Sequence, residues 1–163
     1  MSIHFNADEI FEMAEQIERN GAKFYRKAAE SAEESGLRQT LLDLAAMEDE
    51  HEKTFASMRA DLSAEQRAPV TFDPEGQATV YLRAMADGYV FDVRAVPSEL
   101  LTGDETLTDV LHTAIGLEKD SIIFYLGIKE MVPEKLGKGK IEQIIKEEMG
   151  HITGLSNKLA SLS

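Results

Sequence analysis

Two parts of the chain, 100 residues apart, repeat one pattern of metal-ligating residue types. In each part a glutamate precedes a Glu-x-x-His motif by 30 residues. The residues are Glu18, Glu48 and His51 in the first part, and Glu118, Glu148 and His151 in the second. A Phe-Tyr pair also follows the first glutamate of each part, at 24–25 and 124–125. Because the chain has only four histidines, two of them at equivalent places in a duplicated pattern favour a dinuclear metal site.

These residue types suit two divalent cations. Four carboxylates buried together would be strongly destabilising without compensating charge, and two divalent ions balance them. A histidine three residues after a glutamate lies on the same face of a helix, so each Glu-x-x-His supplies a carboxylate and an imidazole together. Such mixed ligation with open positions suits iron or manganese better than a closed zinc site. A single Glu-x-x-His motif usually lies on a helix surface and binds no metal. Its duplication with equal spacing argues against that alternative here. We expect His4 and His112, outside the repeat, not to bind metal.

Apolar residues at helical spacing predict four helices that carry these ligands on their apolar faces. The predicted ranges are about 7–32, 37–61, 105–132 and 140–161. Asn6 and Glu9 form a capping box at the first helix. The midpoint between each lone glutamate and its Glu-x-x-His is Glu33 or Pro133, and both lie in predicted turns. Each antiparallel hairpin therefore places its three ligands at one height, and two hairpins packed about a pseudo-twofold axis would bring all six together.

The segment between the second and third predicted helices, about 62–103, is too long for a simple turn. Within it, apolar and aromatic residues at helical spacing predict a short helix at about 77–91. Two helical hairpins joined by one long, partly helical crossover are the connectivity of ferritin-like bundles. We therefore predict an all-α, ferritin-like four-helix bundle that forms one domain over 1–163.

The composition of the chain indicates which cellular compartment and which kinds of binding partner to expect. No apolar run is long enough to span a membrane and the start has no signal-peptide pattern, so we expect a cytoplasmic protein. The chain has no cysteine, which excludes disulfides, thiolate metal sites and iron–sulfur clusters within it. A net charge of −13 argues against nucleic acid or an anionic membrane as a partner.

Four further residues could contact the metal ligands: Tyr25, Tyr125, Ser121 and Glu52. Tyr25 and Tyr125 each lie seven residues after a predicted ligand, on the same helix face. They could donate hydrogen bonds to ligand carboxylates or hold a radical, although packing with a satisfied hydroxyl is the commoner role. Glu52, one turn after Glu48, could also contact the ligands, and Ile152 stands at its place in the second half.

Over essentially its whole length, the chain resembles the rubrerythrin branch of the ferritin-like superfamily, through the six residues of the repeat. The resemblance implies the following roles: Glu18 with His51 as terminal ligands of one iron, Glu118 with His151 as terminal ligands of the other, and Glu48 with Glu148 as bridges. It implies two iron ions per chain, which manganese or zinc could replace in vitro. It also implies a peroxide-reducing enzyme that takes electrons from a rubredoxin-type centre.

Two departures from this family are evident. Rubrerythrins usually carry a further glutamate one turn after the third-helix ligand, where this chain has Ser121. They also commonly carry a cysteine-rich rubredoxin domain, which a cysteine-free chain cannot have. An electron donor would therefore be a separate, rubredoxin-like protein.

Three functions follow as hypotheses. The first is a di-iron oxidoreductase that reduces hydrogen peroxide or dioxygen. The second is a ferroxidase or iron-storage protein, and the third is a bundle that metal stabilises without redox turnover. By analogy with related bundles, and because the crossover is rich in aliphatic and aromatic residues, we also expect a homodimer.

Overall fold

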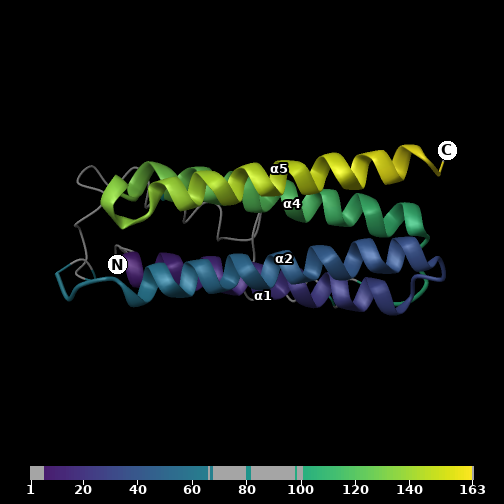
Figure 1. The fold of residues 1–163 in the computed structure, drawn as a ribbon, viewed down its shortest axis with the longest axis horizontal. Helices are drawn as coiled ribbons and strands as arrows, with labels where there is room; N and C mark the ends of the chain where they lie inside the picture. The colour runs from purple at the N-terminus through teal and green to yellow at the C-terminus, as the bar shows by residue number, and fades with distance from the viewer. Residues whose placement is uncertain (1–5, 66, 68–79, 82–97, 99–100, 163) are drawn as a thin grey trace.

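Four long helices form an antiparallel bundle (Figure 1). The structure is a computed structural model that describes residues 6–65, 67, 80–81, 98 and 101–162. The elements are α1 (Ala7–Glu30), α2 (Ser35–Ala60), α4 (Leu107–Met131), the 3₁₀ helix η3 (Glu134–Leu136) and α5 (Lys138–Ala160). Each long helix begins and ends within two residues of its predicted limits, and the described residues contain no strand. The predicted all-α bundle is confirmed.

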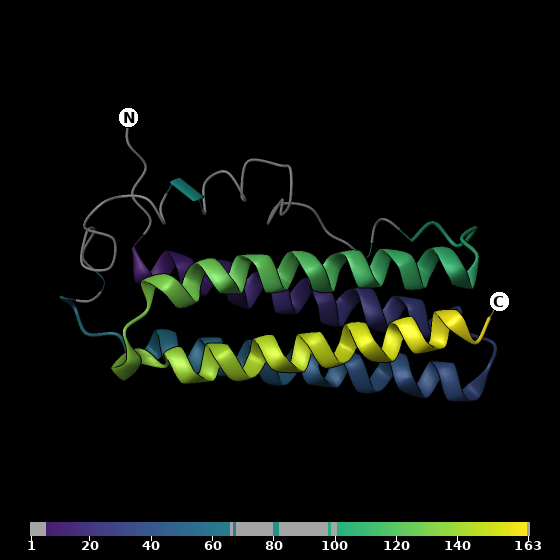
Figure 2. The ribbon, with the colours of Figure 1, turned by 90° about the horizontal axis from the view of Figure 1, so that it is seen from above.

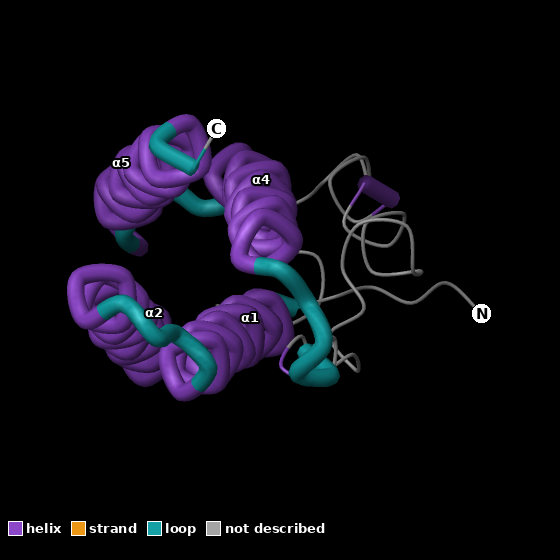
Figure 3. The backbone as a smooth tube through the Cα atoms, turned by 90° about the vertical axis from the view of Figure 1, so that its right-hand side faces the viewer, coloured by secondary structure: helices purple, strands orange, loops and turns teal. Residues whose placement is uncertain are grey.

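The bundle consists of two hairpins. α1 packs along α2, and α4 packs along α5. Viewed from the end, α4 lies beside α1 and α5 lies beside α2, so that helices α1 and α5 are diagonal to each other (Figure 3). The view from above shows that all four helices run nearly the full length of the molecule (Figure 2). Their central turns therefore face one another across a common axis.

Local capping explains where the helices begin and turn. At α1 the Asn6 side chain accepts from the Glu9 N–H at 2.8 Å, and the Glu9 carboxylate accepts from the Asn6 N–H at 2.9 Å. Thr106 and Asp109 form the same reciprocal box at α4. Between η3 and α5, Gly137 adopts φ +103°, and a Cβ there would lie 2.9 Å from a Met58 side-chain carbon. The positive φ therefore favours glycine at this turn, whereas the flexible end of the Met58 side chain could shift to make room for a Cβ.

The hydrophobic core is divided into two clusters by a polar layer. One cluster packs Phe11 and Phe55 against Tyr125 near the end of the bundle where α1 begins. The other packs Tyr25 and Leu111 near the opposite end. The predicted ligands lie between the two clusters, with apolar packing toward both ends of the bundle. No helix within the described part of the chain could cross a membrane.

Only a small part of the predicted crossover helix at 77–91 is described. Val80 and Tyr81 are helical, and the Tyr81 hydroxyl donates to the Ile123 carbonyl of α4 at 3.0 Å. The remainder of that predicted helix lies outside the described residues, as does His4.

Candidate metal centre

One side chain from α1, one from α4 and two each from α2 and α5 meet at the middle of the bundle. They are Glu18, Glu48, His51, Glu118, Glu148 and His151, and we call them the central cluster. Each is at most 5% exposed. The structure thus brings together all six residues that the sequence repeat singled out, whereas His112 is exposed on α4. Their convergence follows from the equal spacing of the three ligands about each hairpin turn.

The central cluster contains two overlapping sets of ligand atoms. Within each set, one atom from every residue lies within 4.8 Å of the others; the sets are Glu18, Glu48, His51 and Glu148, and Glu48, Glu118, Glu148 and His151. Glu148 lies between the two imidazoles, with Oε1 3.1 Å from His51 Nδ1 and Oε2 3.0 Å from His151 Nδ1. Two carboxylates are therefore placed to serve both positions, which is the arrangement a bridged dinuclear site requires.

Unsatisfied polar atoms in the central cluster fit a metal. Nδ1 of His51, Nδ1 of His151 and both carboxylate oxygens of Glu148 are buried and make no hydrogen bond within the described structure. The Nδ1 atoms lie 3.1 and 3.0 Å from the Glu148 oxygens, close enough for ion pairing when the imidazoles are protonated, but these contacts lack hydrogen-bond geometry. Buried polar atoms without partners are rare and costly. Divalent ions would satisfy them, and the donor set of imidazole and carboxylate suits iron or manganese.

The electrostatics of the metal-free cluster are those of crowded acids. Burial, and then the neighbouring carboxylates, raise the pKa of Glu48 well above its usual value. Burial also raises the pKa of Glu118, to about 8. Burial opposes ionisation of Glu148 as well, but the adjacent groups lower its pKa. Burial lowers and the carboxylates raise the pKa of both imidazoles, with a net rise to about 9 for His151 and higher for His51. Without metal, the cluster therefore holds protons near neutral pH.

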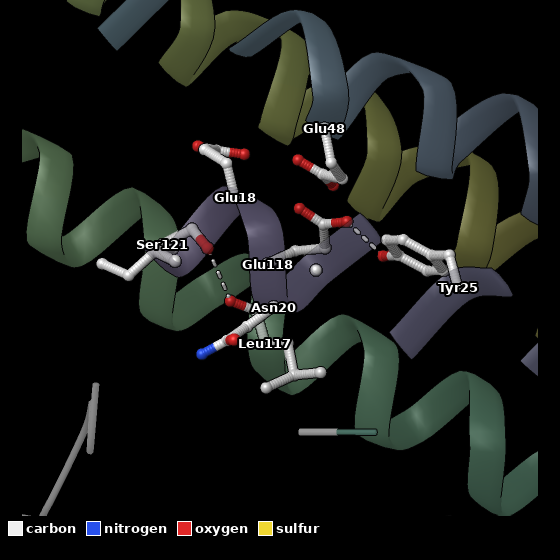
Figure 4. A pocket seen from close by; sticks show the side chains of 9 residues that line it. Glu18, Asn20, Tyr25, Glu48, Leu117, Glu118 and Ser121 are labelled. Atoms are coloured by element: carbon white, nitrogen blue, oxygen red, sulfur yellow. Dashed lines mark hydrogen bonds between the residues drawn. The ribbon is translucent and has the colours of Figure 1, made fainter. Parts of the chain in front are cut away.

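The two predicted tyrosines make crossed hydrogen bonds to the central cluster. The Tyr25 hydroxyl on α1 donates to Glu118 on α4 (Figure 4), and the Tyr125 hydroxyl on α4 donates to Glu18 on α1. Each hairpin thus fixes a carboxylate of the other. Burial, together with these carboxylates, raises the pKa of both hydroxyls, which keeps them protonated as donors. Of the three roles considered from the sequence, the geometry displays two together: both rings pack in the core, and each hydroxyl is satisfied by a ligand carboxylate.

A small cavity adjoins the central cluster between α1 and α4 (Figure 4). Its volume is about 20 Å³, enough for one water-sized molecule. Gly21 leaves space beside Glu48, because a Cβ there would lie 3.4 Å from Glu48 Cγ. Ser121, at the equivalent place on α4, also lines the cavity and donates to the Leu117 carbonyl at 3.0 Å. The cavity leaves room for a small molecule beside Glu18, Glu48 and Glu118.

Glu52, which was also predicted to contact the ligands, forms an ion pair with Arg19. Arg19 Nη2 lies 2.6 Å from Glu52 Oε1, at a half-exposed position on the side of the bundle. A residue not singled out from the sequence contacts the cluster instead: Glu147 Oε2 lies 2.7 Å from His51 Nε2. In the sequence, Glu147 is marked only by its position next to Glu148. The 100-residue repeat does not identify it, because the equivalent residue in the first half is Met47.

Comparisons with known proteins agree with this geometry. The sequence pattern of the rubrerythrin family matches residues 9–159. A crystal structure from Thermotoga maritima, of a protein assigned as ferritin-like diiron-carboxylate, superposes with a TM-score of 0.76 at 27% identity, over 100% of both chains. No curated protein sequence matches the chain significantly. A duplicated Glu and Glu-x-x-His set at the centre of a ferritin-like bundle, and a family match over nearly the whole chain, lead to one conclusion: the chain belongs to the rubrerythrin family.

Proposed function

We propose that the protein is a di-iron oxidoreductase that reduces hydrogen peroxide or dioxygen with electrons from an external donor. One observation carries the proposal: two overlapping ligand sets, with two shared carboxylates, adjoin a cavity of water-molecule size. A closed structural metal site needs no such space.

The residues of the central cluster have distinct roles in this proposal. One metal position would be held by Glu18 and His51 and the other by Glu118 and His151, with Glu48 and Glu148 shared by both. When bound as Fe(II), the two iron ions together supply the two electrons that convert hydrogen peroxide and two protons into two water molecules. The hydroxyls of Tyr25 and Tyr125 hold the two terminal carboxylates in place by hydrogen bonds.

The cavity selects small oxidants. Gly21 and Ser121 flank it, and its volume of about 20 Å³ is close to that of one water-sized molecule, which favours oxidants as small as dioxygen or peroxide over organic substrates. Ser121 replaces the acidic residue that rubrerythrins usually carry there, so on the α4 side of the cavity Glu118 is the one carboxyl group among the lining residues.

Two associations belong to the proposal. Because the chain lacks cysteine, electrons would come from a separate protein, which by the family resemblance has a rubredoxin-like centre. By analogy with related bundles, the protein would act as a homodimer, and sedimentation measurements of its mass test this directly.

Anaerobic stopped-flow mixing of the diferrous protein with peroxide, and separately with dioxygen, tests the function. We expect oxidation much faster than that of the same concentration of free Fe(II), with about two irons per chain throughout. Many irons retained per chain in a large shell would instead indicate iron storage. A metal-loaded protein inert to both oxidants would overturn the proposal in favour of a structural site.

A further inference from the structure

The two imidazoles of the central cluster differ in what their outer nitrogens contact. His51 Nε2 lies 2.7 Å from Glu147 Oε2, at hydrogen-bond distance. His151 Nε2 is buried and has no hydrogen-bond partner among the described residues. In both residues Nδ1 is the nitrogen that faces the carboxylates of the cluster. His51 and His151 are equivalent in the sequence repeat, but only His51 has a carboxylate at hydrogen-bond distance from its outer nitrogen among the described residues.

The difference arises from a single departure from the 100-residue repeat. Glu147 on α5 approaches His51 across the interface with α2, and the residue equivalent to Glu147 in the 100-residue repeat is Met47 of α2. Met47 offers no hydrogen-bond acceptor of comparable strength and is 38% exposed. Glu147 is itself held in place, because Gln143 Nε2 donates to its Oε1 at 2.9 Å.

The contact has a direct consequence for metal binding. An imidazole that ligates a metal through Nδ1 must carry its proton on Nε2. A carboxylate that accepts this N–H fixes the tautomer and the ring orientation and makes the ligating nitrogen more basic. Glu147 can do this for His51, whereas the buried N–H of His151 would have no acceptor within the part of the chain that the structure describes. In the metal position that contains His51, the imidazole is therefore already held in the tautomer and orientation that metal binding requires.

We propose that Glu147 is a positioning residue that makes the two metal positions unequal, so that the position formed by Glu18, Glu48, His51 and Glu148 binds more tightly and fills first. This inference rests on the proposed function in that it requires two metal ions to bind, but it does not require turnover.

Stepwise metal binding tests the inference without any activity measurement. Chelator-treated protein is titrated with Co(II) by calorimetry, and we expect two resolved steps. Glu147→Ala should weaken the tighter step roughly 10- to 100-fold, bringing the two steps together. Glu147→Gln, which keeps an amide oxygen as acceptor, should recover part of the loss. The reciprocal change Met47→Glu should strengthen the weaker step.

The matched control is Glu50→Ala. Glu50 lines the same groove between α2 and α5 as Glu147, but it is exposed and pairs with Lys53, with Nζ 2.5 Å from Oε1. The control removes the same charge close by and should leave both steps unchanged. An equal effect of Glu50→Ala and Glu147→Ala would mean that only long-range charge matters, which would overturn the inference.

Proton NMR of the Co(II)-loaded protein in water gives a second readout, through the imidazole N–H signals shifted by the paramagnetic ions. The His51 N–H should exchange slowly with water in the wild type and faster in Glu147→Ala, whereas the Gln variant should restore slow exchange. Two equal binding steps, or a Glu147→Ala protein with wild-type steps and exchange, would overturn the inference alone. Failure of the wild type to bind Co(II) would overturn the proposed function as well.

Discussion

The α1–α2 hairpin and the α4–α5 hairpin supply the same three ligand types to the central cluster but differ in the residues around them. His51 of the first hairpin is supported by Glu147, whereas His151 of the second has no such partner among the described residues. Gly21 of the first hairpin corresponds to Ser121 of the second, and the ion-paired Glu52 corresponds to Ile152. The residues that repeat between the hairpins are those that metal coordination requires. The residues that surround these ligands differ between the hairpins, and they make the two halves of the site unequal.

One feature of that outer layer does repeat, and it joins the hairpins. Tyr25 and Tyr125 donate to the terminal glutamate of the opposite hairpin, so each half contributes to the geometry of the other. Neither hairpin could therefore form a correctly oriented metal position alone. The two tyrosines make equivalent hydrogen bonds, so the effects of changing them can be compared with the unequal effects expected at the two histidines.

Removing a shared ligand should have the largest effect, because it damages both halves at once. We expect Glu148→Ala to abolish binding at one or both positions, since its carboxylate lies about 3 Å from both imidazoles. At a metal concentration of 1,000 times Kd, one lost ion removes about 4 kcal/mol of stabilisation. The metal-free variant should be less stable than metal-free wild type, because the groups around Glu148 lower its pKa and the change removes its carboxylate from beside the two imidazoles.

Metal analysis of the purified protein and thermal midpoints with and without chelator measure this effect. Glu50→Ala is again the control and should match wild type in both. Two ions per chain in Glu148→Ala, with wild-type stabilisation, would contradict the assignment of Glu148 as a shared ligand.

The second prediction concerns pH and distinguishes metal-free from metal-loaded protein. The pKa of Glu118 is raised from 4.5 to about 8, and that of His151 from 6.5 to about 9. Their contributions to the stability of the metal-free fold are thus complete below the unfolded values and are lost as pH rises through the folded values. Each extra proton held by the folded state corresponds to about 1.4 kcal/mol per pH unit. We expect these two groups together to remove about 3 kcal/mol of stability between pH 6.5 and 8.

Metal displaces these protons, so metal affinity should rise over the same pH range. Guanidinium unfolding in chelator at several pH values, with proton release measured by calorimetry in two buffers, tests both statements. Glu118→Gln should flatten the metal-free curve between pH 4.5 and 8. A metal-free protein that becomes more stable as pH rises through this range would refute the predicted protonation of the second half.

The tyrosine pair should show the symmetry that the histidines lack. Tyr25→Phe and Tyr125→Phe each remove one hydrogen bond to a carboxylate and leave the packing ring in place. We expect each change to cost about 2 kcal/mol in the metal-loaded protein, because hydrogen bonds to charged groups contribute about that much. Denaturant unfolding of both single variants measures the costs. A large inequality between them would show that the asymmetry extends beyond Glu147.

The smallest effect on stability is expected at the cavity. Gly21→Ala places a Cβ 3.4 Å from Glu48 Cγ and fills part of the space beside it. Stability should change by no more than about 1 kcal/mol, since alanine favours the helix by that amount and offsets the close contact. Oxidation of the diferrous protein should nevertheless slow several-fold, with iron content unchanged. Ser121→Ala, the matched change on α4, should leave the oxidation rate close to wild type.

The helices and their order could be predicted from the sequence because the responsible forces are local. The Asn6–Glu9 capping box, the apolar faces and the turns near Glu33 and Pro133 each depend on residues close together in the chain. The ligands could be predicted for a related reason. Equal spacing about a hairpin turn fixes which residues lie at one height, and duplication of the pattern then identifies the second half.

Other features of the centre depend on contacts between helices that no sequence spacing specifies. The amino-acid sequence by itself determined the bundle, its two hairpins and the six residues of the central cluster. Only the tertiary structure decided that Glu147 reaches His51, that the tyrosine bonds cross between hairpins, that Glu52 pairs with Arg19 and that a cavity remains beside Gly21. The physical reason is that helical periodicity fixes the face on which a side chain lies, whereas its partner depends on the packing and rotation of neighbouring helices.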